Sequence, residues 1–327
     1  MVKKAILVTD NFLSKENEET IYAAGFELCR LPVHCAAQDE LIEALKGKSG
    51  YILGGIETVT AAVIKSVDSL QAIVYNSTNY QVYIPACDKA TKRGIAIANC
   101  PGADSTATAE YALTLMLAMA RNIFDIGRTG KATEFIGRSL DELRVGIIGL
   151  GNIGTSFAHL LKNLGIQNVY YYSRTRHAAE ETELGIQYVS KEDLLSSCNV
   201  VSIHTHRSAG EVVSSEELAQ IQDGGIVINV SYPEAVNSAS LIREIKKGRL
   251  RAAYDFPPND VLEEARSVSP GQFFWANEYA GYNTSSALRL SGDMATASII
   301  NLLTTGMDTH LVNPDYLNYR TNEEAAS

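Results

Sequence analysis

The sequence predicts an α/β fold with parallel sheets, and three observations support this prediction. Short β-branched or apolar runs alternate with helical patterns along the whole chain. These runs form two series, which a long apolar helical stretch separates. The second series opens with a glycine-rich turn between a strand and a helix. With 327 residues, the chain is long enough for two domains, each with its own core.

The two series of strands can be placed along the chain. The first contains AILVT (5–9), FELCRL (26–31), YILGG (51–55), AIVYN (72–76) and IAIAN (95–99), and Cys100-Pro101-Gly102 ends it. The second contains VGIIG (145–149), VYYYS (169–173), VVSIHT (200–205), GIVINV (225–230), LRAAYDF (250–256) and FFWANEY (273–279). We expect a long helix between the two series, from Ser105 to Arg121, and a last helical stretch after Thr284.

The composition is that of a soluble globular enzyme, with 46% apolar and 20% charged residues. A formal net charge of -10 argues against nucleic acid or an anionic membrane surface as a partner. The N-terminus lacks the apolar core of a signal peptide, and the apolar stretch Tyr111–Ala120 is about half the length that crosses a bilayer. The five scattered cysteines form no C-x-x-C pair and indicate a reducing compartment. We therefore expect a cytoplasmic protein with no metal site.

The turn G-L-G-N-I-G (149–154) matches the dinucleotide-binding pattern G-x-G-x-x-G and lies between an expected strand and an expected helix. Gly149 permits the tight turn, Gly151 lets the backbone approach a pyrophosphate, and Gly154 lets the helix pack closely on the strand. The helix N-terminus then offers unpaired N–H groups to the phosphates. The alternative is a purely structural turn, but this context favours a dinucleotide site.

The end of the next strand distinguishes the two nicotinamide cofactors. An NAD site usually has an acidic residue there, which holds the ribose hydroxyl groups. Here the strand ends with Ser173, Arg174, Thr175 and Arg176, without a carboxylate. Arginine can bind a 2′-phosphate through charge-assisted hydrogen bonds, which favours NADP(H). The alternative is that both arginines are only solvated surface residues.

Five segments in order resemble the D-isomer-specific 2-hydroxyacid dehydrogenases: RGIAIANCPGADSTATAEYALTLMLAMAR (93–121), VGIIGLGNIG, VVSIHTH, GGIVINVS and LRAAYDF. The resemblance implies a Rossmann dinucleotide-binding domain inserted in a smaller flavodoxin-like α/β substrate domain. The implied limits are 1–101 for the first part of the substrate domain, 102–284 for the Rossmann domain, and 285–327 for a C-terminal helix that returns to the substrate domain, with a tail. The resemblance also implies a homodimer through the helix that contains Tyr111–Ala120.

The resemblance also assigns cofactor-binding residues. In the family, the aspartate that matches Asp255 holds the nicotinamide carboxamide, and the residues that match His204–His206 and Val230–Tyr232 line the nicotinamide side of the cleft. Taken with the glycine turn and the strand end that follows it, the expected cofactor-binding residues are Gly149, Gly151, Asn152, Ile153, Gly154, Ser173, Arg174, Thr175, His204, Thr205, Val230 and Asp255. We expect them to bind NADP, with NAD as the less favoured cofactor.

The chain departs from the family pattern on the substrate side. The family's arginine, which clamps the substrate carboxylate, matches Tyr232 in NVSYPEAVN. The catalytic histidine matches Glu278 in NEYAGY, and the glutamate that pairs with that histidine matches Asp260, one methylene shorter. The substrate loop usually has a G-x-D-x-x-D-like pattern, but it reads NSTNYQVYIP (76–85) here.

Three interpretations of Glu278 are open. The protein is a non-catalytic module that senses NAD(P)H, or Glu278 is only a surface residue, or Glu278 is the proton donor or the anchor of a different substrate. The third is favoured because the flanking Trp275 and Tyr279, and Asp260 nearby, are expected to raise the pKa of Glu278. A carboxyl group that is protonated near neutral pH can donate a proton.

Other side chains define further alternatives. Tyr232 offers its phenol to the reacting oxygen or nitrogen, or forms an aromatic lid over the cofactor. His206 is a candidate acid, or a loop-end histidine that faces solvent. Without the family's arginine, a substrate with a cationic or protonatable nitrogen suits Glu278 and Asp260, which favours the reduction of an imine or amino-carbonyl compound. If Arg207 supplies the positive charge and His206 the proton, the chain is an ordinary 2-oxo acid/2-hydroxy acid dehydrogenase.

Overall fold

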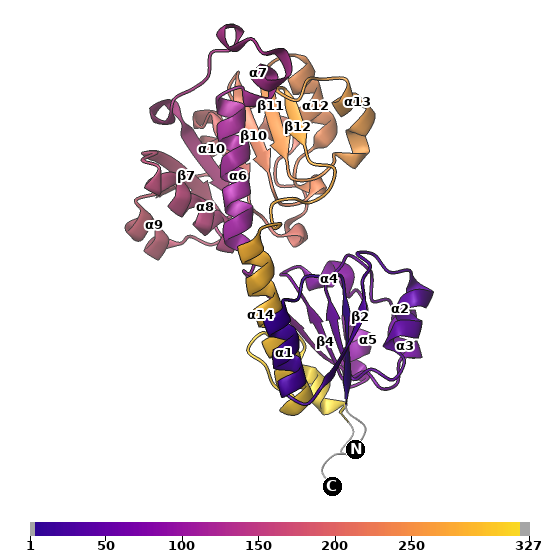
Figure 1. Ribbon diagram of the computed structural model, residues 1–327. Coiled ribbons are helices and arrows are strands. Elements are labelled where there is room, and N and C mark those ends of the chain that lie inside the picture. Colours follow the sequence, from indigo (N-terminus) through magenta and orange to yellow (C-terminus); the bar gives the residue numbers. More distant parts are fainter. Residues whose placement is uncertain (1–3, 321–327) are drawn as a thin grey trace. The chain divides into compact units, whose positions relative to one another are not determined.

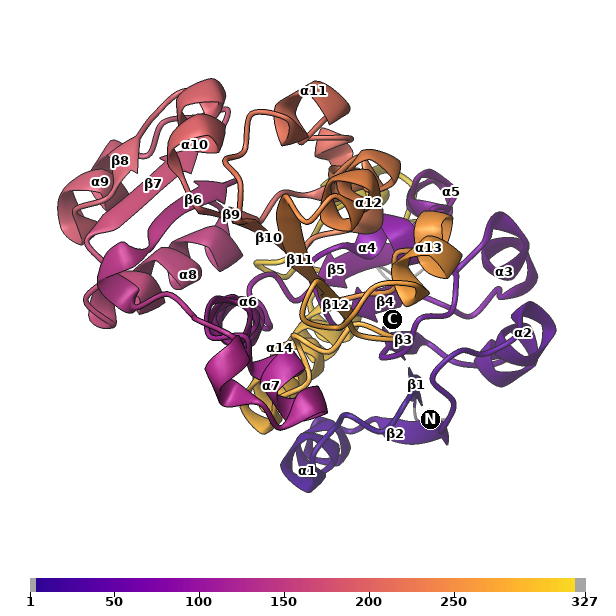
Figure 2. The ribbon, with the colours of Figure 1, turned by 90° about the horizontal axis from the view of Figure 1, so that it is seen from above.

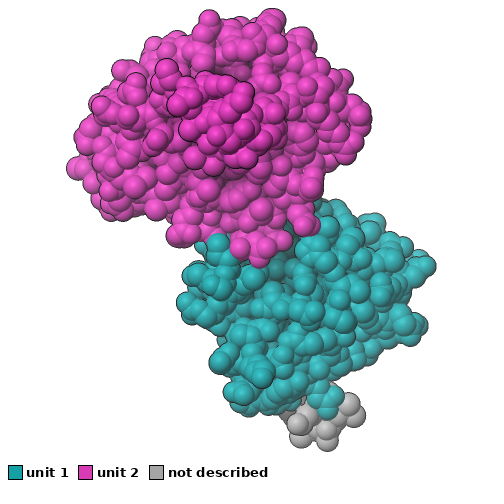
Figure 3. All heavy atoms as spheres, turned by 45° about the horizontal axis from the view of Figure 1, so that its top comes forward, with its two compact units in different colours: residues 1–104, 284–327 teal, residues 105–283 magenta. Residues whose placement is uncertain are grey.

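In the computed structural model, which describes residues 4–320, the chain folds into two compact units (Figures 1 and 3). Unit 1 comprises residues 1–104 and 284–327, and unit 2 comprises residues 105–283. The chain therefore leaves unit 1 once and returns to it once, so that unit 2 is an insertion within unit 1.

Unit 1 is built around a five-stranded parallel sheet with the order β2-β1-β3-β4-β5. Its strands are β1 (Ala5–Thr9), β2 (Glu27–Leu31), β3 (Gly50–Leu53), β4 (Ala72–Tyr75) and β5 (Ala96–Asn99). Its helices are α1 (Lys15–Ala23), α2 (Gln38–Leu45), α3 (Ala61–Ser66), α4 (Tyr80–Tyr83), α5 (Cys87–Lys92) and α14 (Ser285–Thr304), followed by the 3-10 turn η6 (Pro314–Asn318). This strand order is that of flavodoxin-like folds, which confirms the predicted class.

The sheet of unit 1 is covered on both faces, as parallel sheets usually are. Helices α2, α3 and α5 pack on one face, and α1 and α14 pack on the other (Figures 1 and 2). Every residue of β3, β4 and β5 is buried, which explains why these segments read as continuous apolar runs.

Unit 2 is built around a seven-stranded parallel sheet with the order β12-β11-β10-β9-β6-β7-β8. Its strands are β6 (Arg144–Ile148), β7 (Asn168–Tyr172), β8 (Gln187–Tyr188), β9 (Val200–Ile203), β10 (Gly225–Asn229), β11 (Leu250–Tyr254) and β12 (Phe273–Trp275). The order reverses between β6 and β9, which is the Rossmann arrangement and confirms the prediction for this domain.

Helices cover both faces of the unit 2 sheet as well (Figure 2). They are α6 (Ser105–Ala120), α7 (Ile123–Thr129), α8 (Asn152–Asn163), α9 (Ala178–Leu184), α10 (Lys191–Ser197), α11 (Ser215–Leu218), α12 (Ser238–Lys246) and α13 (Leu262–Arg266). Short 3-10 turns are η1 (Ala132–Glu134), η2 (Leu140–Glu142), η3 (Arg207–Ala209), η4 (Pro233–Ala235) and η5 (Asn259–Val261). Helices α6 and α8 pack on one face, whereas α10, α11 and α12 pack on the other.

One expected strand is shorter than predicted, and this matters for the site. The strand expected at 273–279 ends at Trp275, so that Glu278 lies in a loop. The reason is that the amides of Ala280 and Gly281 bond to the buried carboxylate of Asp255 and not to a neighbouring strand. Within the described residues, no helix combines the length and the apolar character needed to cross a membrane.

Candidate functional site

In the turn after β6, glycine is required at two positions for different steric reasons and leaves open space at the third. Gly149 has a φ of +95°, and a Cβ there would lie 2.5 Å from the carbonyl oxygen of His204. A Cβ on Gly154 would overlap the carbonyl oxygen of Gly149, so helix α8 can pack this closely only with glycine. A Cβ on Gly151 would meet nothing within 4 Å, so this position faces open space. The turn therefore leaves room beside the backbone for a ligand.

Helix α8 begins beside this open space. Gly151 is its N-cap residue, and no side-chain hydrogen bond caps this end, so the first-turn N–H groups of Asn152 and Ile153 have no side-chain partner there. Phe157 and Leu161 anchor the helix to the sheet in the fully buried core. The arrangement fits a pyrophosphate, because free amides and the positive end of the helix dipole both favour an anion.

The two arginines that follow β7 differ in their contacts. Arg176 forms two hydrogen bonds of 2.8 Å with the carboxylate of Glu181, and this contact lowers the pKa of Glu181 to about 2. Arg174 is exposed, and no residue within 4–320 forms a hydrogen bond or ion pair with it. Ser173 and Thr175 flank it, joined by a hydrogen bond from the Ser173 hydroxyl to the Thr175 carbonyl. Arg176 is thus a structural residue, whereas Arg174 is available to a phosphate.

His204 lies under the glycine turn and is buried. Its Nε2 is 2.8 Å from the Ser202 hydroxyl, and its Nδ1 has no hydrogen-bond partner. Burial lowers the pKa of His204 to about 3, so the imidazole is neutral at neutral pH. The expected cofactor residue Thr205 donates its N–H to Ser231 at 3.0 Å, and Val230 is buried.

Asp255 holds the loop that follows β12. Its Oδ1 accepts the N–H groups of Ala280 at 2.7 Å and Gly281 at 2.9 Å, and Gly281 also lies 3.1 Å from Oδ2. A Cβ on Gly281 would lie 2.7 Å from the carboxylate, so this position requires glycine. Burial raises the pKa of Asp255 to about 6, and the two backbone donors oppose that rise. Asp255 therefore fixes the chain just after Glu278.

Glu278 lies in the loop that follows β12, and its side chain is exposed. Trp275 packs against Phe273, and Tyr279 packs against Phe256, with ring centroids 5.6 and 5.3 Å apart. Trp275 is thus partly buried against the core of unit 2, whereas Tyr279 contacts Phe256 at the surface and remains 38% exposed.

Asp260 is also exposed, in η5. It lines a hollow of about 330 Å³ together with Glu211 and Glu234. Three of the residues that line this hollow are therefore carboxylates, and the others are Val236, Asn237, Ser238 and Ala239.

The phenol of Tyr232 is already engaged. It donates a hydrogen bond of 2.7 Å to the carbonyl of Gly210 and accepts one of 3.3 Å from the Thr205 hydroxyl. The guanidinium of Arg207 lies 5.8 Å from the centre of the Tyr232 ring and forms an ion pair of 3.4 Å with Glu234. Tyr232 therefore holds the loop that follows β9, and Arg207 already has an anionic neighbour.

His206 caps the short turn that follows it. Its Nδ1 accepts the N–H of Ser208 at 3.2 Å, and the ring is exposed. No carboxylate forms an ion pair with this ring among the residues that the structure describes. His206 is therefore available to a ligand through Nε2, because its Nδ1 is occupied by the N–H of Ser208.

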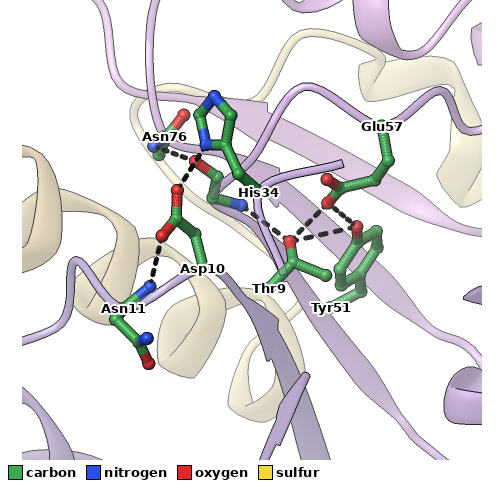
Figure 4. Close-up of polar contacts among 8 residues, drawn as sticks. Thr9, Asp10, Asn11, His34, Tyr51, Glu57 and Asn76 are labelled. Carbon is green, nitrogen blue, oxygen red and sulfur yellow. Dashed lines mark hydrogen bonds and ion pairs between the residues drawn. The ribbon is translucent and has the colours of Figure 1, made fainter. Parts of the chain in front are cut away.

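Unit 1 has a polar network where its strands end (Figure 4). We call this region the carboxyl edge of unit 1; it comprises Thr9–Asn11, His34, Gly54–Glu57 and Asn76, with Tyr51 of β3. One oxygen of the buried Glu57 accepts the hydroxyl groups of Thr9 and Tyr51. The sequence pattern does not single out this network, because its members follow different strands and are up to 67 positions apart in the chain.

The turn after β3 is fixed by the same network. Gly54 donates its N–H to the Thr9 hydroxyl at 3.0 Å, and its carbonyl accepts the Asn76 side chain at 2.9 Å. Close to this turn, Nδ1 of His34 donates to Asp10 at 2.7 Å. The only signal in the sequence that could have indicated this pair is that both residues lie just after an expected strand.

Comparisons with known proteins agree with this arrangement. A model of the D-isomer specific 2-hydroxyacid dehydrogenase NAD binding domain matches residues 113–275. The chain is 28% identical to the glyoxylate reductase of Thermococcus litoralis over 85% of this chain and 87% of that protein. A Schizosaccharomyces pombe protein that bears the name of a 2-hydroxyacid dehydrogenase is 31% identical over 69% of this chain and 68% of the relative.

Solved structures with the same fold are also known. The NAD+-bound 3-phosphoglycerate dehydrogenase of Entamoeba histolytica superposes with a TM-score of 0.77 at 21% identity, over 95% of this chain and 99% of that one. The Rossmann order of unit 2, its open glycine turn and the uncapped helix α8 fit a nicotinamide dinucleotide. The chain belongs to the D-isomer-specific 2-hydroxyacid dehydrogenases, a family of NAD(P)-dependent oxidoreductases.

Proposed function

We propose that this chain is an NADP(H)-preferring member of its family with a substrate site remodelled around Glu278. The observation that carries the cofactor preference is the exposed Arg174 after β7, which has no partner within residues 4–320 and no carboxylate beside it at the strand end. Its guanidinium can bind a 2′-phosphate in two charge-assisted hydrogen bonds. When bound, the reduced nicotinamide supplies a hydride.

The cofactor preference can be tested by substituting Arg174. Arg174→Ala should weaken NADPH binding by about 10- to 100-fold and leave NADH binding unchanged, because only NADPH has the 2′-phosphate. Cofactor fluorescence gives both dissociation constants. Arg266→Ala is the control, since Arg266 is also an exposed arginine of unit 2 and its ion pair with Glu263 lies on α13. Tighter binding of NADH than of NADPH by the unaltered protein would contradict the preference.

The charges of the loops in unit 2 support a substrate with a basic nitrogen. Tyr232 stands where the family has an arginine, and the nearby Arg207 is paired with Glu234. Glu278 and Asp260 are exposed carboxylates with no ion-pair partner among the residues described. We therefore propose that Glu278 anchors a cationic nitrogen and that the reaction reduces an imine or an amino-carbonyl compound. The exposure of Glu278 favours this anchoring role over that of a buried proton donor.

The substrate class can be tested with NADPH oxidation against cyclic imines, amino ketones and simple 2-oxo acids. Glu278→Gln should lower kcat/KM for the nitrogen-containing acceptors by about 10- to 100-fold, mainly through KM, because it removes one charge-assisted contact. Glu263→Gln provides an exposed carboxylate on the same unit as a control. Binding of NADPH without oxidation by any acceptor would instead favour a protein that senses the cofactor.

A second candidate substrate class is the 2-oxo acids, because the relative from Thermococcus litoralis is named glyoxylate reductase. This alternative requires Arg207 to release Glu234 and bind a carboxylate, with His206 as the acid. Oxidation of NADPH by glyoxylate that is lost in Arg207→Ala and kept in Glu278→Gln would favour it.

We also propose that the chain forms a homodimer. Leu113 and Leu117 of α6 are only partly buried, and the segment that follows leaves the side chains of Ile123 and Ile136 exposed at 55% and 96%. A second copy that covered this region would bury them. Light scattering should give the mass of a dimer, and Ile136→Asp should shift it toward that of a monomer.

A further inference from the structure

A hollow with a positively charged lining lies on unit 1, between the neighbouring helices α3 and α5 (Figure 2). Its volume is about 400 Å³, which is within the range of small-molecule sites. All its lining residues belong to α3, to α5 or to the position that ends α5; they are Ala61, Ile64, Lys65, Lys89, Lys92 and Arg93. The hollow is therefore formed within unit 1 alone, by residues other than those of the carboxyl edge.

The charges in this hollow are opposite in sign to the charge of the whole chain. Four of the six lining side chains are cationic, and none is a carboxylate. The side chains of Lys65, Lys89 and Lys92 are exposed, and their ammonium groups form no hydrogen bond or ion pair within residues 4–320. Because the chain has a formal net charge of -10, three unpaired lysines around one hollow mark a place that attracts anions.

Arg93 differs from the three lysines, because it is used to hold the two helices together. Its Nη2 donates to Asp68 at 2.9 Å, and its Nη1 donates to the carbonyl of Ile64 near the end of α3. Since Arg93 itself ends α5, these contacts tie the last turns of both helices to each other. The charge of Arg93 is offset by Asp68, and the charges of the lysines remain for a ligand.

The three lysines reach the hollow from two different helices. Lys89 and Lys92 are three positions apart on α5 and therefore lie on the same face of it, and Lys65 lies in the last turn of α3. A lysine in the last turn complements the helix dipole, which explains such a residue on each helix separately. It does not explain why three unpaired ammonium groups line one hollow, where they repel one another. An anion bound among them would remove this repulsion.

The remaining wall of the hollow is apolar. Ile64 is buried and Ala61 is half-buried, and both pack in the core of unit 1 on the side of α2, α3 and α5. A wall anchored in this way keeps its shape when a ligand binds. Charged groups beside an apolar wall suit a ligand that has an anionic end and an apolar body, because each part meets a matching surface.

We propose that the hollow between α3 and α5 binds an organic phosphate, a small molecule with adjacent phosphate groups next to an apolar ring. The phosphate oxygens accept charge-assisted hydrogen bonds from Lys65, Lys89 and Lys92, and the ring lies against Ala61 and Ile64. Adjacent phosphates are assigned because a single phosphate would leave part of the charge of three lysines unbalanced. The assignment concerns unit 1 alone and does not depend on the cofactor preference or the substrate proposed above.

The experiment titrates the full-length protein with adenosine diphosphate and with inorganic pyrophosphate in a calorimeter. NADH or NADPH, whichever binds more tightly, is present at saturation, so that the glycine turn of unit 2 is occupied. The double variant Lys89→Ala/Lys92→Ala should bind adenosine diphosphate at least about 10-fold more weakly than the unaltered protein. The control Lys15→Ala/Lys46→Ala, which removes the same charge from exposed lysines of unit 1 outside the hollow, should bind it unchanged. Pyrophosphate should bind more weakly than adenosine diphosphate, because it lacks the ring.

A second measurement needs no variant. Adenosine diphosphate should protect Lys65, Lys89 and Lys92 of the unaltered protein from acetylation, as read by mass spectrometry, and should leave Lys15 and Lys46 reactive. Equal weakening in both double variants, or binding that disappears at physiological ionic strength, would mean an adventitious ion only and overturn the proposal. Absence of binding to the unaltered protein, or of protection at these three lysines, would overturn it as well. Equally tight binding of pyrophosphate would overturn the role of Ala61 and Ile64.

Discussion

The two sheets of this protein end in a similar way, with a buried titratable side chain beside a glycine turn. In unit 2 it is His204, beside Gly149 and Gly154, and in unit 1 it is Glu57, beside Gly55. Each has one polar atom with a partner and one without. The similarity ends with the partners, because Glu57 receives two hydroxyl groups on one oxygen, whereas His204 meets only the hydroxyl of Ser202.

This difference shows two ways of building the loop at the end of a strand. The turn of unit 2 contains glycines, which have no side chains, so that the backbone faces open space at Gly151. The carboxyl edge of unit 1 is made by adding polar side chains that hold one another, including Thr9 and Tyr51. The first leaves room for a phosphate beside the backbone, and the second fixes the turn after β3 through side-chain hydrogen bonds. Four sets of measurements can separate the two designs.

The largest effect is expected from His204 in acid. Burial lowers its pKa from 6.5 to about 3, so its contribution to stability is complete above pH 6.5 and is lost as the pH falls to 3. The whole range corresponds to roughly 5 kcal/mol, of which about 2 kcal/mol is lost between pH 7 and pH 5. His204→Gln should remove this dependence. Urea unfolding of both proteins at pH 7 and pH 5 should show the stability difference between them changing by about 2 kcal/mol; a constant difference would mean that acid does not charge a buried His204.

Asp255 should respond in the opposite direction, although it belongs to the same unit. Burial raises its pKa from 3.8 to about 6, so its contribution to stability is complete below pH 3.8 and is lost as the pH rises through 6. The full range corresponds to roughly 3 kcal/mol. Asp255→Asn should therefore lose the gain in stability that the unaltered protein obtains from this group between pH 6 and pH 4. The same unfolding series measures it, and a variant that still shows the gain would assign the effect to another carboxylate.

The glycine turn was predictable from sequence because all its determinants lie within six residues, 149–154. The alternation of strands and helices likewise predicted both sheets, since it depends on local burial. The end of β12 at Trp275 was not predictable, because Asp255 accepts the N–H groups of Ala280 and Gly281, which lie 25 and 26 positions further along the chain. The contact between Asp10 and His34 was not predictable for the same reason, because contacts between loops that follow different strands leave no periodic pattern in the sequence.

Gly151 and Gly154 of the glycine turn provide a direct test of whether its open space receives the cofactor. Gly154→Ala forces a Cβ onto the carbonyl of Gly149 and should cost about 2 to 3 kcal/mol of stability. Gly151→Ala meets nothing within 4 Å, so its stability should change by less than about 0.5 kcal/mol, yet NADPH should bind at least about 10-fold more weakly. Thermal unfolding and cofactor fluorescence separate the two effects. Unchanged NADPH binding by Gly151→Ala would show that the open space does not receive the pyrophosphate.

The smallest effects should appear at the carboxyl edge of unit 1, where Tyr51→Phe and Thr9→Val each remove one hydroxyl donor from Glu57. Burial raises the pKa of Tyr51, so its phenol is protonated and its loss should cost about 1 kcal/mol. Thr9→Val should cost about 2 kcal/mol, because the Thr9 hydroxyl also accepts the N–H of Gly54 and valine leaves that buried donor unpaired. Thr9→Ser keeps the hydroxyl and should recover most of the difference. Equal losses of stability in Tyr51→Phe and Thr9→Val would mean that the turn after β3 does not depend on the Thr9 hydroxyl. The contrast with the glycine turn of unit 2, which needs no side chain to hold it, would then disappear.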